Sequence, residues 1–359
     1  MSVQPSRAET IRKSRRTAVL AAFLAGSGWI SGVLADDTAP AKTSPAATSG
    51  ITQTAATASS TTVAAKHVLT YKFQPGHFVH YVGANRVQYT TQLGDQYTTE
   101  SGPTQLEVGT FQSHQSNDTN THFRVVKVDD DGGALIEPVV DRTRMTAQMH
   151  GKKAVIFDSA SSGAVPPEFV AIRESIGRTV ARFQVAPNGK LMKATIVDET
   201  APKSLRDAAE RLDTRFPFLS LLPATPVAVG DKWREEYSVI VLNGGLKQPL
   251  PMRRIYELAA VADGIAVIKF KTLVLAAVNE PELEKQLIQQ VPTGTIEFDI
   301  ERGLVRSYTS VIDRTTINAF GPKSLLQVKG ESTEKLVTGD PAEKVEASSS
   351  QPATSEAKP

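Results

Sequence analysis

The stretch Pro223–Tyr237 reads PATPVAVGDKWREEY and lies between two halves of the chain that look like copies of one unit. A turn is expected at Gly230-Asp231, followed by a strand, because Trp233 and Tyr237 begin a series of large residues at alternate positions. The first half opens in the same way, with aromatic residues on both sides of a turn at Pro75-Gly76. This stretch therefore marks the start of a second unit.

Two further landmarks keep the same spacing in both halves. Pro167 precedes the turn glycine Gly189 by 22 positions, and Pro281 precedes Gly303 by 22 positions. Such Pro-Glu and turn signals are common, so chance remains an alternative to an internal duplication. We interpret the pattern as a duplication.

Alternating apolar residues separated by turn signals predict strands through most of the chain. Strands are expected in the first half at 67–74, 77–93, 104–113, 121–129, 134–148, 153–158, 179–186 and 190–197, and in the second half at 231–242, 251–261, 265–278, 294–301, 304–318 and 323–337. Helices are expected after Pro166-Pro167, over 202–216 and after Asn279, where Glu282 completes a cap.

These elements predict an α+β, mostly antiparallel β fold. It consists of two similar curved-sheet-plus-helix units, residues 66–200 and 223–337, joined by a helical connector over 201–222. The run FPFLSLL at 216–222 is too apolar for solvent and is expected to pack across the joint between the units.

The two ends of the chain have compositions that do not support a folded core. Residues 1–35 resemble a signal peptide with cleavage after Ala35, an uncleaved membrane anchor being the alternative. Nine Ala, eight Thr and four Ser fill 21 of the 30 positions in 36–65, which predicts a disordered linker. A disordered tail is expected over 338–359. The chain is therefore expected in the periplasm or at the cell surface, by either the general or the twin-arginine export route.

Charge and cysteine content exclude several classes of function. The formal charge is +2, but residues 1–35 carry five basic side chains and one acidic one, so the rest of the chain is at −2. That balance provides no basic surface for nucleic acid. The absence of cysteine excludes disulfides, thiolate nucleophiles and cysteine-ligated metal sites.

No motif in the sequence carries an identifiable chemistry, so no catalytic, cofactor-binding or metal-binding residue is assigned. All six histidines lie in the first half, at positions 67, 77, 80, 114, 122 and 150, which is the best hint of a site. His77 and His80 are three apart on an expected strand, so they point to opposite faces and do not form a chelating pair. The run from Asp129 to Gly132 lacks the glutamate of a calcium loop and is interpreted as a turn.

Aromatic side chains offer a candidate binding surface. Trp233, Tyr237, Phe78, Tyr81 and Phe298 are expected to line the inside of the curved sheets. Core packing is the ordinary explanation for such residues. The alternative is an apolar groove between sheet and helix that holds a lipid or another apolar small molecule.

Three segments resemble a family of uncharacterised exported proteins from planctomycete-type bacteria. They are VAVGDKW at 227–233, YKFQPG at 71–76 and TIEFDI at 295–300, and the resemblance covers about residues 68 to 337. It implies a signal peptide, a β-rich body and an envelope location, and it transfers no activity.

The sequence thus predicts a non-enzymatic envelope protein that binds an apolar ligand in a sheet-and-helix groove. The alternative is a scaffold or interaction protein that contacts other envelope proteins, and a hydrolase is the third interpretation. Two or more histidines with a carboxylate in one cleft would favour the hydrolase. The ligand, the partner and the oligomeric state are not determined by the sequence.

Overall fold

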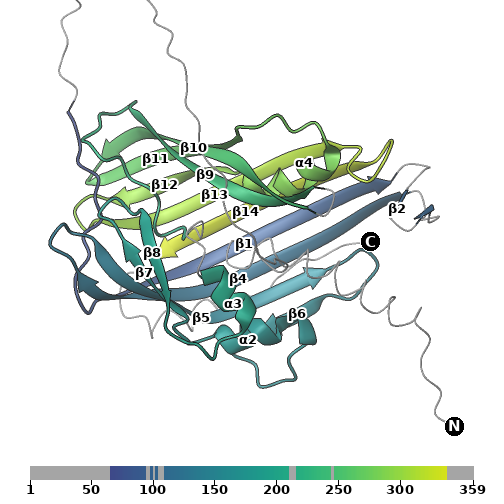
Figure 1. The fold of residues 1–359 in the computed structure, drawn as a ribbon, viewed down its shortest axis with the longest axis horizontal. Coiled ribbons are helices and arrows are strands. Elements are labelled where there is room, and N and C mark those ends of the chain that lie inside the picture. The colour runs from purple at the N-terminus through teal and green to yellow at the C-terminus, as the bar shows by residue number, and fades with distance from the viewer. Residues whose placement is uncertain are drawn as a thin grey trace, which may run out of the picture.

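The computed structural model describes residues 65–93, 98–99, 102–103, 109–209, 216–243 and 246–337. The predicted signal peptide, the tail and all but the last residue of the linker lie outside these ranges. Within the described residues the protein is nearly all β, with one large antiparallel sheet and a few short helices (Figure 1).

Twelve strands form the sheet, in the order β8-β7-β5-β4-β1-β14-β13-β12-β11-β10-β9, with β6 pairing beside β5. The strands are β1 (Phe78–Leu93), β4 (Gly109–Val128), β5 (Ala134–Gln148), β6 (Val155–Asp158), β7 (Ala181–Val185), β8 (Leu191–Ile196), β9 (Lys232–Asn243), β10 (Leu246–Ala262), β11 (Ile265–Val274), β12 (Thr293–Asp299), β13 (Leu304–Ile317) and β14 (Leu325–Leu336). Two very short strands, β2 (Thr98–Thr99) and β3 (Gly102–Pro103), pair separately.

The expected α+β class, with two sheet units joined by a helical connector, is wrong. β1 of the first half pairs with β14 of the second half, from Tyr81 opposite Leu336 to Gln92 opposite Leu325, so the two halves share one continuous sheet. The sequence shows strands but not which edges meet, and the two expected sheet edges satisfy each other's backbone groups. The boundaries assigned to the two halves stay predictions.

The helices are shorter than the sequence predicted. In the described residues they are η1 (Pro167–Phe169) with α2 (Val170–Ser175), α3 (Lys203–Ala209), and α4 (Pro281–Leu287) with η2 (Ile288–Gln290). The first and last begin at the expected prolines, but Glu280 occupies the N-cap of α4 and makes no side-chain capping bond. Of the helix expected over 202–216, residues 203–209 are helical and 210–215 lie outside the described residues.

Most strand predictions agree with the observed strands, with two exceptions. The segment 67–74 is not a strand and makes one isolated bridge, between His67 and Val227. The strands expected at 104–113 and 121–129 belong, where they are described, to one long strand, β4, and residues 104–108 lie outside the described residues. No strand was expected over 114–120, but the backbone there pairs on both sides, with β1 and with β5.

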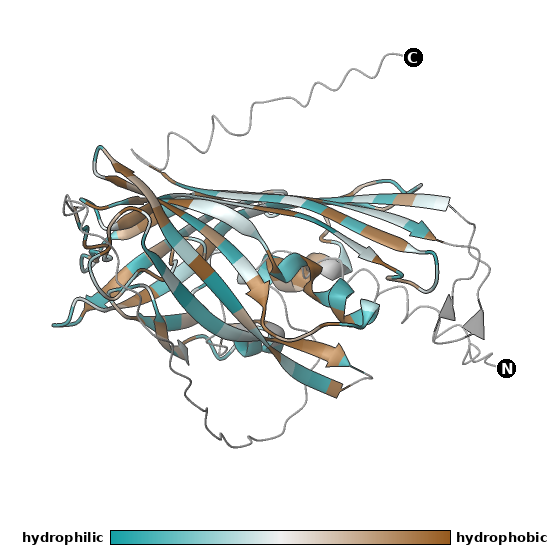
Figure 2. Cartoon of the chain, turned by 90° about the horizontal axis from the view of Figure 1, so that it is seen from above, coloured by the Kyte–Doolittle hydropathy of each residue, from teal (hydrophilic) through white to brown (hydrophobic). Residues whose placement is uncertain are grey.

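The sheet has two chemically different faces, which follow from the alternation of side chains along each strand. We call the face that carries the buried Tyr81 and Phe123 the inner face, and the opposite one the outer face. The edge strand β9 shows the rule: Trp233 and Tyr237 are half-buried, while their neighbours Arg234 and Ser238 are exposed. The sheet curves, and helices lie on its concave side (Figure 2).

The chain crosses from one edge of the sheet to the other between β8 and β9. On this path the segment 216–222, which we call the crossing segment, lies in the main core on the inner face. Phe218 stacks on Tyr81 with ring centroids 5.3 Å apart and on Phe123 at 5.1 Å. The predicted burial of this apolar run is confirmed, and it contacts strands of the first half at the centre of the sheet.

Hydrogen bonds fix the crossing segment to three other parts of the chain. The Tyr71 hydroxyl donates to the Ser220 carbonyl at 3.0 Å, and the Trp233 indole N–H donates to the Leu221 carbonyl at 2.8 Å. The Leu222 N–H donates to the carbonyl of Asn188, in the β7–β8 turn, at 2.9 Å. The segment therefore links β9, the β7–β8 turn and the N-terminal segment 69–73.

We predict that Gly189→Ala destabilises the protein by about 3 kcal/mol, more than the ordinary cost of about 1 kcal/mol for alanine at a positive φ. Gly189 has φ +83°, and an added Cβ would lie 2.6 Å from Tyr71 Cε2 and 2.7 Å from the Ser220 carbonyl oxygen. Gly151→Ala is the matched control, because Gly151 has φ +65° and nothing within 4 Å. Urea denaturation measures both, and equal losses would contradict the proposed packing at Gly189.

Candidate functional site

The inner face is apolar at both ends of the strands and polar in the middle. The main core at one end packs Tyr81, Phe123 and Phe298 under the crossing segment. Towards the other end, Val87 and Val328 form a second apolar cluster with Ile288 of η2. Between these zones lie buried polar side chains, namely Thr121, Arg254, Thr272, Ser310 and Glu334. The face is therefore amphipathic along the strand direction.

Helix α4 and η2 cover part of this face, from the edge strand β9 towards the central strands. Leu283 and Leu287 of α4 pack against Met252 of β10. Gln289 of η2 donates a hydrogen bond to the hydroxyl of Tyr89 on β1. The side-chain oxygen of Gln286 accepts a hydrogen bond from the Leu242 N–H at 2.8 Å, and its side-chain nitrogen donates to the Leu242 carbonyl at 2.9 Å. A side-chain amide therefore satisfies part of the unpaired edge of β9.

A small open depression lies on the β1–β4–β5 part of the sheet. It is lined by Asn85, Gln115, Ser116, Asn117, Met145, Thr146 and Ala147. One border is the apolar cluster of Val87 and Ile288, and the other is formed by Met145 with Phe157 and Phe169. The depression thus has polar groups between two helix-covered apolar clusters.

Arg254 on β10 is the buried cation of the inner face and is only 9% exposed. Its guanidinium lies 4.8 Å from the centroid of the Phe270 ring, and its Nε donates to the Thr272 hydroxyl at 3.1 Å. The Tyr256 hydroxyl donates to the carboxylate of Glu235 at 2.9 Å. A charged and hydroxyl-rich zone is therefore held among aromatic rings, where each polar contact is strengthened by low solvent access.

Glu334 on β14 is the buried acid of the same zone. Burial raises its pKa to about 8, although the Phe218 N–H donates to the carboxyl group and works in the opposite direction. Among the described residues, Glu334 Oε2 and the hydroxyl of Thr121 have no hydrogen-bond partner. Such buried groups are usually satisfied by a polar partner or by ordered water.

Of the five aromatic residues expected to line a groove, Tyr81, Phe298 and Trp233 belong to the main core or pack against it, while Tyr237 and Phe78 lie elsewhere. Trp233 and Tyr237 are half-buried on the inner face of β9. Tyr81 and Phe298 are 1% and 0% exposed and fill the core, the ordinary role of such residues. Phe78 is 55% exposed and lies beside His122 on the outer face. The lining role stays a prediction for Trp233 and Tyr237.

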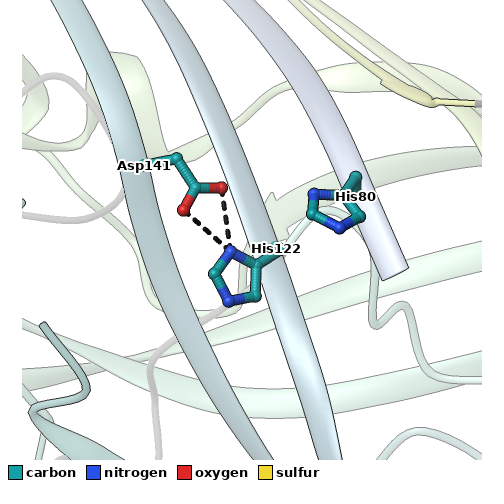
Figure 3. Close-up of side chains that lie close together, drawn as sticks. All are labelled: His80, His122 and Asp141. Atoms are coloured by element: carbon teal, nitrogen blue, oxygen red, sulfur yellow. Dashed lines mark hydrogen bonds and ion pairs between the residues drawn. The ribbon is translucent and has the colours of Figure 1, made fainter. Parts of the chain in front are cut away.

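The structure brings two histidines and an aspartate together on the outer face (Figure 3). His80 of β1 pairs directly with His122 of β4, and their ring centroids are 5.2 Å apart. The Nδ1 atom of His122 lies 2.8 Å from each carboxylate oxygen of Asp141 on β5. Partial burial lowers the pKa of His80, and the electrostatic effect of the neighbouring His122 lowers it further.

Sequence reasoning missed this cluster because its members are 42 and 19 positions apart and meet only through strand pairing. The gathering of all six histidines in the first half was noted as the best hint of a site, and two of them, His80 and His122, belong to this cluster. A second signal was available: His80 and His122 each precede a buried aromatic residue in an expected strand, which places both on one face. The run from Asp129 to Gly132 forms the β4–β5 turn, as predicted, with the Gly132 N–H donating to the Asp129 carbonyl at 2.9 Å.

Comparisons with known proteins do not identify the chain. No protein-family model matches it, and no curated protein matches it significantly. The resemblance to exported planctomycete-type proteins therefore stays a prediction. Among the described residues, no helix is long and apolar enough to cross a membrane.

Three solved structures show a distant likeness. Lipovitellin, in a structure of its lipid-protein interactions, has 12% identity and a TM-score of 0.40, and the match covers 79% of this chain but 26% of that chain. DynF of Micromonospora chersina has 5% identity and a TM-score of 0.18 over 79% of this chain and 89% of its own. An outer membrane channel of Pseudomonas putida F1 has 9% identity and a TM-score of 0.19. The match covers 74% of this chain and 98% of that chain. Likenesses at these TM-scores transfer no function.

We predict that Glu334→Gln stabilises the protein increasingly as the pH rises from about 5 to about 8. The folded chain holds the Glu334 proton up to a pKa of about 8, whereas the unfolded chain releases it near the ordinary 4.5. Wild-type stability must therefore fall across this window, and each pKa unit corresponds to about 1.4 kcal/mol.

Urea denaturation of both proteins at pH 5, 7 and 9 measures this effect. Gln keeps the shape of the protonated acid and its acceptor for the Phe218 N–H, but it does not ionise. A stability difference that does not change with pH would show that Glu334 titrates near its ordinary value.

Proposed function

We propose that this protein is a non-catalytic binding protein of the cell envelope whose inner sheet face takes up an apolar or amphiphilic molecule. The observation that supports this most is the amphipathic inner face of a single curved sheet. A polar middle zone with Arg254 and Glu334 lies between apolar zones at both ends of the strands. An amphiphile, such as a lipid, presents the same two chemistries at one surface.

The half-buried apolar side chains under α4 are the part of the face that we assign to the apolar portion of the ligand. Tyr237 and Val239 of β9, Val278 and Val291 pack around the cluster of Met252 and Leu283 without being fully buried. Covering such residues removes apolar surface from water, at about 25 cal/mol per Å². The polar groups of the middle zone orient the other end of the molecule.

A second candidate function is that of a scaffold or interaction protein. It is favoured by apolar residues exposed on the outward side of the edge strand β9. Ile240 is 53% exposed and Leu242 44%. Exposed apolar residues that gather at one place on a surface are typical of protein contacts.

We predict that Val239→Asp removes a bound amphiphile and that Ile240→Asp does not. The two residues are neighbours on β9, but Val239 faces inward and Ile240 faces outward, so the pair changes one face at a time. Native mass spectrometry before and after organic extraction, on protein from an exporting host, measures the adduct. A loss of about tenfold or more in adduct is expected for Val239→Asp.

Two outcomes separate the two functions. A wild-type protein that carries no extractable adduct, and binds none from mixed lipid vesicles, would overturn the binding function. Crosslinks to other envelope proteins that are lost in Ile240→Asp and kept in Val239→Asp would support the interaction function. Circular dichroism and urea denaturation of both variants check that the sheet is intact.

Export is the remaining part of the proposal. Residues 1–35 have the composition of a signal peptide, and Val33 and Ala35 occupy the two positions at which the cleavage rule asks for short side chains, which suits cleavage after Ala35. We expect the chain recovered from an exporting host to begin at Asp36, as measured by intact mass and N-terminal sequencing. A chain that keeps residues 1–35 in the membrane fraction would instead support an uncleaved anchor.

A further inference from the structure

We propose that His80, His122 and Asp141 form a zinc-binding site on the outer face of the sheet. Each of these three side chains offers one ligand atom, and these atoms all lie within 4.8 Å of one another. The site is separate from the inner face, so this proposal does not depend on ligand binding there.

The position of the three residues follows from the register of three adjacent strands. His80 and His122 are directly opposite each other on β1 and β4, where side chains of one face are close neighbours. On β5 the pairing with β4 shifts between Val140 and Arg142, so that Asp141 is an extra residue in a β-bulge. Bulges re-aim side chains, and this one brings the Asp141 carboxylate to His122.

The ligand set suits zinc. Zinc is bound by imidazole nitrogen and carboxylate oxygen, and sites with three protein ligands keep a fourth position for water or another donor. Bonds of about 2.0–2.2 Å put neighbouring ligand atoms of a tetrahedral zinc roughly 3.4 Å apart. The three ligand atoms lie within 4.8 Å of one another, and small rotations of their partly exposed side chains bring them to this separation.

The surroundings shelter the site without closing it. The His122 side chain is 17% exposed and that of Asp141 is 38% exposed. The Phe78 ring lies 5.5 Å from the ring of His122, and Val139, which pairs with His122 on β5, is buried. The carboxylate of Asp141 lies 2.8 Å from Nδ1 of His122, so two of the three proposed ligands are already held side by side.

The competing explanation is a simple ion pair between His122 and Asp141, with His80 beside it by chance. Exposed pairs of this kind contribute little to stability. The two explanations differ in what they predict for a metal, since an ion pair without a metal site binds zinc neither stoichiometrically nor with dependence on His80.

Isothermal titration with zinc chloride, on the tag-free chain in a buffer that does not bind metals, tests the proposal. One zinc per chain is expected. His80→Ala, His122→Ala and Asp141→Ala are each expected to weaken zinc binding by about tenfold or more, because each removes one of the three ligands. The matched control is His114→Ala, because His114 is exposed on the same strand and face, and its zinc binding is expected to equal that of the wild type.

A second readout is stability, which zinc changes only where it binds the folded chain. The three ligands are brought together by folding, so zinc is expected to raise the unfolding midpoint of the wild type and of His114→Ala. It should leave the double variant His80→Ala/His122→Ala unchanged. No stoichiometric binding by a folded wild type, or binding that survives in the double variant, would overturn the proposal and leave an ion pair.

Discussion

The docking of the crossing segment on the centre of the sheet is the interaction on which the rest of the structure depends. A curved sheet of twelve strands exposes a large apolar inner face, and something must cover it. The chain supplies this cover itself when it returns from β8 to β9, because Phe218 stacks on both Tyr81 and Phe123. Without that stack, the central strands β1 and β4 would present their aromatic residues to water.

The same segment holds distant parts of the fold together through its backbone. Its carbonyls accept hydrogen bonds from Tyr71 and Trp233, and the Phe218 N–H donates to Glu334. A buried irregular segment needs such partners for its backbone groups. The raised pKa of Glu334 is a consequence, because the acid that receives the Phe218 N–H lies in an apolar interior.

The two faces of the sheet have different chemistry, and we assign them different roles. The inner face alternates between apolar and polar zones and is covered in part by α4 and by the crossing segment, which favours an amphiphilic ligand. The outer face carries charged and imidazole side chains in register across neighbouring strands, which favours a metal ion. Alternation of side chains along each strand is what keeps these two chemistries apart.

Local patterns in the sequence determined most of the strands. Period-two alternation depends only on neighbouring residues, so the spacing of Trp233 and Tyr237 predicted β9. Glycine turns such as the one at Gly189 predicted where strands end. The apolar character of 216–222 also determined that this segment is buried. Helix starts at Pro167 and Pro281 were correct for the same reason, since proline acts on the residues next to it.

Only the tertiary structure decided which strands are neighbours. Pairing of β1 with β14 joins residues about 245 positions apart, and no local signal specifies such a partner. The fold class was therefore wrong, although its strands were largely right. The cluster of His80, His122 and Asp141 was hidden for the same reason, since it depends on the register of three strands and on one bulge. Alternation in the sequence predicts on which face of its strand a residue lies. Only long-range strand pairing determines which residues of other strands lie beside it.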